Sequence, residues 1–181
     1  MGYRLAALLV VLWSLTGQAF GADAPGDAHT IRITDLPGDP PGFESFPAGK
    51  LFTGKPAKPD IRTQALARLF RTRLLEGART GSNFAGHYTV IRWGCGAGCT
   101  QLAIADAVSG RVFFPANLQS VDNVNVDTAF DDAGINLVQY RRDSRLLVVI
   151  GGINETDALR GISYFAWEGD HLTRLRFQAK P

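Results

Sequence analysis

The residues with the clearest capacity for chemistry in this sequence are two cysteines, Cys95 and Cys99, which flank the tripeptide Gly-Ala-Gly. In an exported chain, which the N-terminal segment described below indicates, a pair of cysteines forms a disulfide by default. A tight turn of flexible glycines can supply the Cα separation of roughly 4.4 to 6.8 Å that the bond requires. The spacing therefore favours a disulfide, worth about 2 kcal/mol for a loop of about five residues.

Three other chemistries could use the same thiols. A redox pair more often has the spacing Cys-x-x-Cys at the start of a helix, whereas here the spacing is one residue longer and the setting is rich in β-structure. A Cys95 nucleophile could be activated by His87, eight residues earlier, if the thiol stayed reduced. Zinc would need further ligands from His29, His87 or His171, which show no zinc-finger spacing. We therefore expect no metal and no cofactor.

The glycines around the cysteines suggest a binding surface. They could present consecutive backbone N–H groups to an anion, or they could serve only the positive φ angles of a tight cross-linked turn. Trp93 stands beside the loop and is a candidate for ligand contact, although the core is the commoner place for a strand tryptophan. The candidate binding surface comprises Asn83, His87, Trp93, Gly94, Gly96 and Gly98.

The elements that would position this loop are mostly β-strands. Residues 87–93 are rich in β-branched and aromatic side chains, which is typical of a strand. Hairpins are predicted from 101–106 to 112–114, from 136–140 to 146–150, and from 162–167 to 172–177. Before them, apolar residues at helical spacing predict an amphipathic helix of about four turns, which begins at Asp60 and ends near Gly77. The sequence thus predicts an α+β fold, with one N-terminal amphipathic helix packed on a mostly antiparallel, hairpin-rich sheet whose curling or splitting stays open.

The chain before that domain divides in two. Residues 1–21 combine Arg4, an apolar run of about eleven residues and small residues at the end, which predicts a cleaved bacterial signal peptide and a periplasmic or secreted protein. The run is shorter than the roughly 20 residues of a membrane-spanning helix, so no stable membrane span is expected after cleavage. Residues 22–59 hold seven of the nine prolines and predict an extended arm. Residues 60–181 have the size of a single domain.

The charge balance limits the choice of partner. The chain has 19 basic and 17 acidic residues and a formal net charge of +2, without the strongly basic balance of a nucleic-acid-binding domain. We therefore expect an envelope protein or a small ligand as the partner, and no nucleic acid.

The cysteine loop belongs to a longer pattern. Its parts are Asn83-Phe84-Ala85-Gly86-His87-Tyr88, Trp93-Gly94-Cys95-Gly96-x-Gly98-Cys99, Ile104-x-Asp106, Ser109-Gly110-x-Val112, Ser144-Arg145-Leu146-Leu147-Val148-Val149 with Gly151-Gly152, and the aromatic strand near Tyr164 and Trp167. This pattern resembles a group of small exported bacterial proteins of uncharacterised function, and it covers much of the region from 60 to 177. The resemblance implies export and a shared fold, and it names no catalytic residue.

Two functional hypotheses follow from the sequence. The first is a non-enzymatic envelope binding or interaction module whose recognition surface includes the loop from Cys95 to Cys99. It is favoured because the catalytic motifs G-x-S-x-G, S-x-x-K, H-E-x-x-H and the P-loop do not occur in the sequence. The alternative is a small hydrolase or transferase that uses Cys95 with His87.

Overall fold

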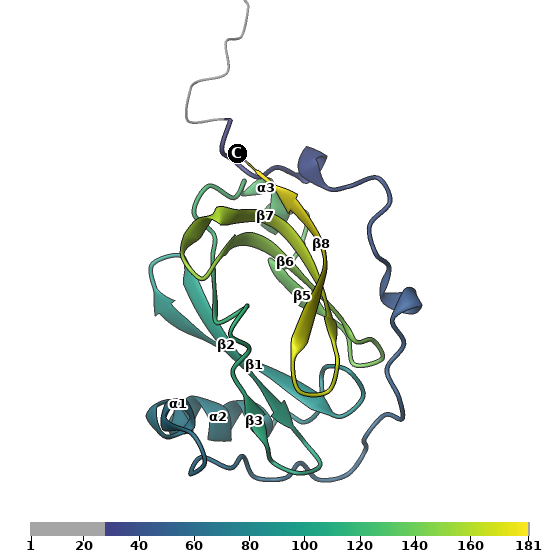
Figure 1. The fold of residues 1–181 in the computed structure, drawn as a ribbon, viewed down its shortest axis with the longest axis vertical. Coiled ribbons are helices and arrows are strands. Elements are labelled where there is room, and N and C mark those ends of the chain that lie inside the picture. The colour runs from purple at the N-terminus through teal and green to yellow at the C-terminus, as the bar shows by residue number, and fades with distance from the viewer. Residues whose placement is uncertain (1–27, 181) are drawn as a thin grey trace, which may run out of the picture.

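A computed structural model describes residues 28–180, most of which surround one eight-stranded sheet (Figure 1). The strands are β1 (Tyr88–Gly96), β2 (Cys99–Asp106), β3 (Val112–Phe113), β4 (Ser120–Asp122), β5 (Val138–Tyr140), β6 (Leu146–Ile153), β7 (Thr156–Trp167) and β8 (Leu172–Ala179). Every pairing between these strands is antiparallel, so the predicted mostly antiparallel sheet is confirmed. The predicted signal peptide, residues 1–21, lies outside the described residues.

The sheet is open and curled. Its strands follow the order β1-β2-β4-β6-β7-β8, with β3 paired to β2 and β5 paired to β6. The curl brings the start of β1 to the β7–β8 turn, where the Tyr88 hydroxyl donates a hydrogen bond of 2.9 Å to the Gly169 carbonyl oxygen. The Tyr88 ring also meets the Trp167 ring edge-on, at a centroid distance of 5.1 Å. Figure 1 shows the concave inner face that results.

Side chains that alternate along the strands supply an inner and an outer face, and both are packed. The inner face forms the main core, with Val90, Leu102, Val149, Phe165 and Trp167 among its members. The outer face of β1 and β2 is covered by helices, and the outer face of β6 and β7 is covered by the N-terminal arm together with residues 126–137. The near-continuous apolar run of β6 reflects burial on both faces, since all of its eight residues are buried.

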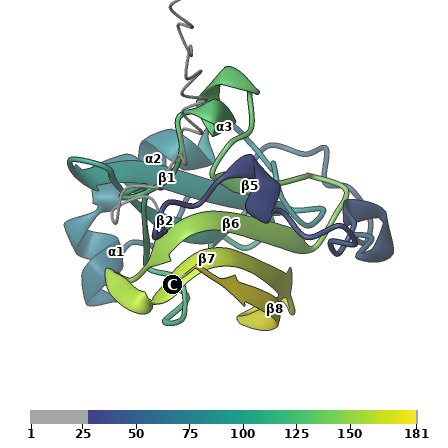
Figure 2. The same cartoon turned by 90° about the horizontal axis from the view of Figure 1, so that it is seen from above.

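Two short helices stand where the sequence predicts a single helix of about four turns. α1 (Ala65–Leu69) and α2 (Arg71–Ala78) meet at Phe70, whose backbone leaves the helical region with φ −97° and ψ 20°. There the Phe70 ring packs on Trp93 at a centroid distance of 4.7 Å. The predicted start at Asp60 is wrong, because its carboxylate accepts the Arg62 N–H in a turn that precedes α1. Figure 2 shows both helices beside β1 and β2, away from β8.

The predicted role of Gly77 as a helix cap is also wrong, because this glycine lies within α2. A Cβ at Gly77 would stand 2.4 Å from Cγ2 of Ile91 on β1. The glycine therefore lets the helix approach the strand closely, with Leu74 and Ala78 of α2 buried in the same contact.

The arm runs as an extended chain along the outer side of the sheet and reaches α1 at the far end (Figure 1). Its regular pieces within residues 28–59 are two 3-10 turns, Ile33–Asp35 and Phe43–Ser45. Phe43 and Phe46 pack against the outer cluster of β6 and β7. The buried Ser144 hydroxyl lies 2.8 Å and 3.0 Å from the carbonyl oxygens of these two residues, which ties the arm to the start of β6.

Candidate binding groove

The predicted disulfide between Cys95 and Cys99 is present, with the two Cα atoms 5.2 Å apart. It closes the turn between β1 and β2, where the register shifts between Gly94 and Gly96 and leaves a bulge at Cys95. Gly98 has φ +67°, and a Cβ there would meet the Asn123 side chain at 2.4 Å. A glycine is required at this position because both the backbone angle and the close neighbour exclude a side chain.

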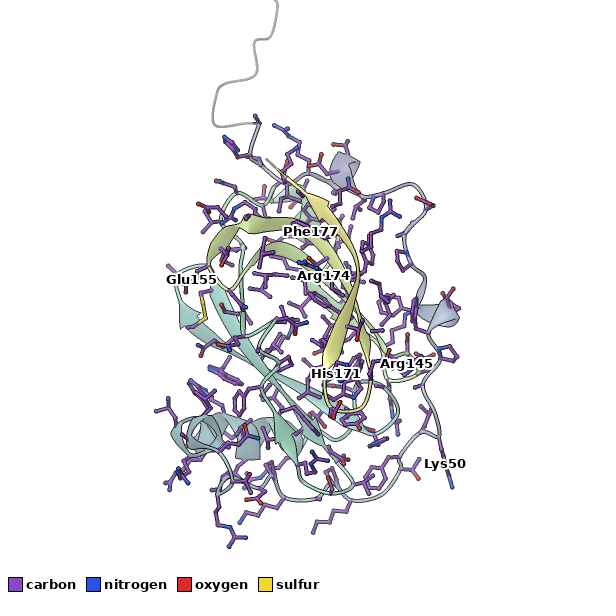
Figure 3. The ribbon with its side chains drawn as sticks, in the orientation of Figure 1. Lys50, Arg145, Glu155, His171, Arg174 and Phe177 are labelled. Carbon is purple, nitrogen blue, oxygen red and sulfur yellow. A yellow bond between two sulfur atoms is a disulfide. The ribbon has the colours of Figure 1, made fainter. Side chains whose placement is uncertain are left out.

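The structure does not bring Cys95 and His87 together. His87 precedes β1 and Cys95 lies near its other end, and eight residues of extended strand span about 26 Å. His171 lies in the β7–β8 turn, at the opposite end of the sheet from the disulfide (Figure 3). Both sulfur atoms are committed to the disulfide, and residues 28–180 contain no free thiol. The arrangement therefore does not support the alternative of a Cys–His hydrolase or transferase.

Two members of the expected binding surface serve the fold instead. Trp93 is 8% exposed and its Nε1 donates a hydrogen bond of 3.0 Å to the Gln101 side chain. Asn83 bonds the backbone of Val90 on both sides, because its Oδ1 accepts the Val90 N–H and its Nδ2 donates to the Val90 carbonyl oxygen. Neither side chain is available as a ligand contact beside the cysteine loop.

His87 also has a local role. Its ring stacks on Tyr88 with a centroid distance of 4.2 Å, and its Nε2 lies 3.8 Å from the Asp106 carboxylate. That carboxylate accepts hydrogen bonds from the Val108 N–H and the Ser109 hydroxyl, and so organises the β2–β3 turn. His87 is therefore part of a turn at the far end of β1, whereas Gly94, Gly96 and Gly98 remain at the disulfide loop.

The disulfide loop borders a polar groove whose central side chain is Arg92. Val90 faces the inner core, and two residues later the exposed Arg92 lies on the same face of β1. The inner face is hollowed at this point, where Arg92 and residues of β5 border the same openings. The Arg92 guanidinium stands over the Tyr140 ring, 5.7 Å from its centroid. Within residues 28–180 it makes no side-chain hydrogen bond and no ion pair.

Two adjoining hollows make up the groove, and Arg92, Asn136 and Val138 line both of them. The first hollow, of about 350 Å³, reaches the disulfide loop and is completed by Gly98, Cys99, Thr100, Val121, Asn123, Asp131 and Leu137. The second, of about 390 Å³, extends along β5 and is completed by Phe43, Gln139, Tyr140 and Arg141. The groove is therefore elongated, and Arg92 lies where its two halves meet.

The groove offers mainly neutral hydrogen-bonding groups around one unpaired guanidinium. Arg141 is already engaged, with Nη1 2.8 Å from the Glu44 carboxylate and its guanidinium carbon 4.6 Å from the Phe43 ring centroid. Asp131 of α3 (Ala129–Asp132) is the one carboxylate among the groove residues. Such a set can hold an anionic group at Arg92 and bind polar groups on either side.

Of the residues that form this groove, the sequence had indicated Gly98 and Cys99, but Arg92, Asn123 and Asn136 were missed. An arginine at an inward-facing position of an apolar strand was a usable indication, because such a charge needs an opening in the core or a partner. Asn123 and Asn136 gave no such indication, since asparagine is common in turns for conformational reasons.

The fold and the groove define a disulfide-containing, antiparallel β-protein with a polar surface groove. No protein-family model, curated protein or solved structure matches the chain. The resemblance to small exported bacterial proteins therefore remains a prediction. In the part of the chain that the structure describes, no helix is long and apolar enough to cross a membrane, and no group of three or more His, Cys, Asp or Glu side chains could hold a metal ion.

Proposed function

We propose that this protein is an exported binding module of the bacterial envelope, and that its recognition site is the groove around Arg92. The disulfide supports an oxidising compartment, such as the periplasm or the exterior. It also supports recognition, because a cross-linked loop holds one wall of the groove in place before the ligand arrives, which lowers the entropic cost of binding.

The ligand that fits this groove best is an extended polar molecule with an anionic group. The anion would bind the Arg92 guanidinium, which can offer two parallel N–H donors to a carboxylate or phosphate. Thr100, Asn123 and Asn136 would exchange hydrogen bonds with the neighbouring polar groups. The flat ring of Tyr140 and the apolar Val138 would contact the less polar parts.

One observation carries this proposal, namely the exposed, unpaired guanidinium of Arg92 at the centre of an elongated groove. Two other arginines of the sheet are engaged with carboxylates, Arg176 with Asp39 at 3.2 Å and Arg145 with Glu168 at 3.1 Å, and the exposed Arg174, which also lies on an aromatic ring, does not line the groove. An arginine held on an aromatic ring inside a groove has lost part of its conformational freedom already, so it can bind an anion at a smaller entropic cost.

The proposal is tested by NMR titration of the ¹⁵N-labelled protein with paired ligands that differ in charge. Suitable pairs are an acetylated glutamate-containing tetrapeptide with its glutamine counterpart, and a uronic-acid disaccharide with its neutral counterpart. We expect the anionic members to shift the amide resonances of Gly98, Thr100 and Asn136 and the Nε resonance of Arg92. The neutral members should bind about tenfold or more weakly.

The matched control is Arg174 of β8, whose guanidinium also lies over an aromatic ring, 5.3 Å from the Phe177 centroid (Figure 3). Arg92→Gln should remove the preference for the anionic ligands, and Arg174→Gln should leave it unchanged. Equal effects of the two substitutions, or no shift at the groove with any anionic ligand, would contradict the proposal.

A further inference from the structure

A second groove lies on the other side of β1, between residues 55–59 of the arm and helix α2. It has a volume of about 360 Å³, within the range of small-molecule sites. Its apolar lining consists of Pro56, Ala57 and Leu75, which are half-buried, with the buried Pro59 and Ala78 beneath them. Three cationic residues, Lys55, Lys58 and Arg79, also line it, and no acidic residue does.

Both walls of this groove are fixed to the sheet. The arm wall is held by backbone hydrogen bonds of 2.8 Å from Ala57 to the Ala107 carbonyl and from Asp60 to the Gly110 carbonyl. Gly110 permits this approach, because a Cβ there would stand 2.4 Å from the Lys58 carbonyl oxygen. The helix wall is fixed by the close contact of α2 with β1 described above. The groove is thus formed without a ligand, and binding would cost little reorganisation.

The region around this groove is more positively charged than the rest of the described chain. Residues 55–79 carry seven basic side chains against two acidic ones, Asp60 and Glu76, whereas the other described residues carry 11 basic against 13 acidic ones. None of the three cations that line the groove has a side-chain hydrogen bond or an ion pair within residues 28–180. The positive potential of this region is therefore not neutralised locally.

We propose that this groove binds an amphipathic organic anion, a molecule whose apolar chain is attached to a carboxylate or phosphate. The chain would lie on Pro56 and Leu75, where it leaves water. The anionic group would lie between Lys58 and Arg79 at the rim. The combination of both features indicates such a ligand. An apolar ligand would not require the cations, and a simple inorganic anion would not require five apolar residues.

This proposal is independent of the function proposed for the Arg92 groove. Arg92 extends from the inner face of β1, whereas α2 covers the outer face of the same strand. The two sites can therefore be tested separately, since a variant at one leaves the residues of the other unchanged.

The test is an NMR titration of the ¹⁵N-labelled protein with octanoate and octyl phosphate, each beside two reference compounds. Acetate supplies the charge without the chain, and octanol supplies the chain without the charge. We expect octanoate and octyl phosphate to give saturable shifts at residues 55–59 and 75–79, with both reference compounds at least tenfold weaker. Equal affinity for acetate or for octanol, or shifts confined to other residues, would overturn the proposal.

Variants test whether the cations of the groove bind the anionic group of the ligand. An exposed ion pair with one cation is expected to contribute about fivefold to the affinity. Lys58→Gln and Arg79→Gln should each weaken octanoate binding by about that factor. Lys50→Gln and Arg174→Gln, which change exposed cations that do not line the groove (Figure 3), should have no effect. Unchanged affinity in both groove variants would overturn the proposal.

Binding to vesicles distinguishes between two sources of the anion, a free amphipathic ligand and a lipid surface. Sedimentation with vesicles of phosphatidylglycerol and of phosphatidylcholine measures charge-selective membrane binding. Because Arg4 could itself favour the anionic lipid, Lys58→Gln and Arg79→Gln are compared with the unchanged chain to find the share that comes from the groove. Charge-selective sedimentation without a response to octanoate or octyl phosphate would show a membrane-docking surface instead, and so would overturn the proposed groove ligand.

Discussion

Replacing Arg160 tests whether its ion pair with Asp122 holds the two halves of the sheet together. Arg160 of β7 places its Nη1 2.8 Å from the Asp122 carboxylate of β4, and the two side chains are 11% and 9% exposed. Asp122 belongs to the short strand that pairs with Cys99 of β2 on one side and with Gly152 of β6 on the other. The ion pair therefore fixes the strand that joins the β1–β2 layer to the β6–β8 layer.

The expected cost follows from what the carboxylate would lose. In Arg160→Gln, Asp122 would keep the Val124 N–H at 3.2 Å but would lose its cation. The carboxylate lies against Gly152, which leaves room for it because a Cβ there would stand only 2.2 Å from one of its oxygens. Removing one partner of a buried pair costs about 3 to 5 kcal/mol. That is a large share of the roughly 5 to 15 kcal/mol that stabilises a domain.

Urea denaturation at pH 7 measures this cost, with Arg176→Gln as the control. The Arg176 side chain pairs at 3.2 Å with Asp39, whose side chain is 91% exposed, so its loss should cost less than about 1 kcal/mol. The double variant Asp122→Asn with Arg160→Gln should recover part of the loss, because no buried charge is left unpaired. The reasoning is refuted if Arg160→Gln costs no more than Arg176→Gln.

Three further predictions concern other parts of the fold. Replacing both Cys95 and Cys99 by serine should lower the free energy of unfolding by about 2 kcal/mol, and a cooperative urea transition should persist. Burial raises the pKa of Asp35, but the Arg32 N–H and the Lys180 ammonium outweigh it and hold that pKa below its usual value of 3.8. The contribution of Asp35 to stability is therefore complete above about pH 4 and is lost as the pH falls through the lower folded-state pKa. Lys180→Gln should reduce this acid dependence, which is measured as the change in the urea midpoint from about pH 5 to about pH 2. Gly77→Ala should lower the thermal midpoint through a loss of about 1 to 3 kcal/mol, because the added methyl group meets a β1 side chain at 2.4 Å.

Each of these predictions has a control. Reduction of the native protein should reproduce the stability of the double serine variant, and complete unfolding on reduction would contradict the estimate. Asp39→Asn, at an exposed pair on the same arm, should leave the acid dependence unchanged. Gly94→Ala should be nearly neutral, since a Cβ there has no heavy atom within 4 Å. A loss at Gly94→Ala as large as that at Gly77→Ala would contradict the steric argument.

The three predicted hairpins are confirmed as strand pairs β2–β3, β5–β6 and β7–β8. They were readable because alternation and turn residues are local properties of the chain. The pairing of β6 with β7 was not predicted, although it is one of the longest in the sheet. Its turn is formed by Asn154 and Glu155, both at φ +54°. The short turn matches the twist of the paired strands, but a glutamate in this conformation gives no sequence signal.

In the helical region, the type of structure was predicted correctly but the buried face was not. The apolar residues at helical spacing in this region include Leu66 and Leu69, yet these are 41% and 72% exposed. The smaller Ala67 and Ala78 are buried instead, together with Leu74. Helical periodicity identified the correct type of structure, but the face that meets the sheet was chosen by close approach to β1, which small residues allow.

What the sequence determined by itself is what depends on neighbours in the chain. The disulfide is of this kind, because a tripeptide with two glycines brings Cys95 and Cys99 together, and so is the strand character of β1. The tertiary structure alone decided the groove, since Arg92, Thr100 and Asn136 come from separate segments that meet only after the sheet curls. The alternation of side chains along a strand predicts that Arg92 shares a face with Val90. Only the curl of the sheet determines that this face is closed over Val90 and open at Arg92.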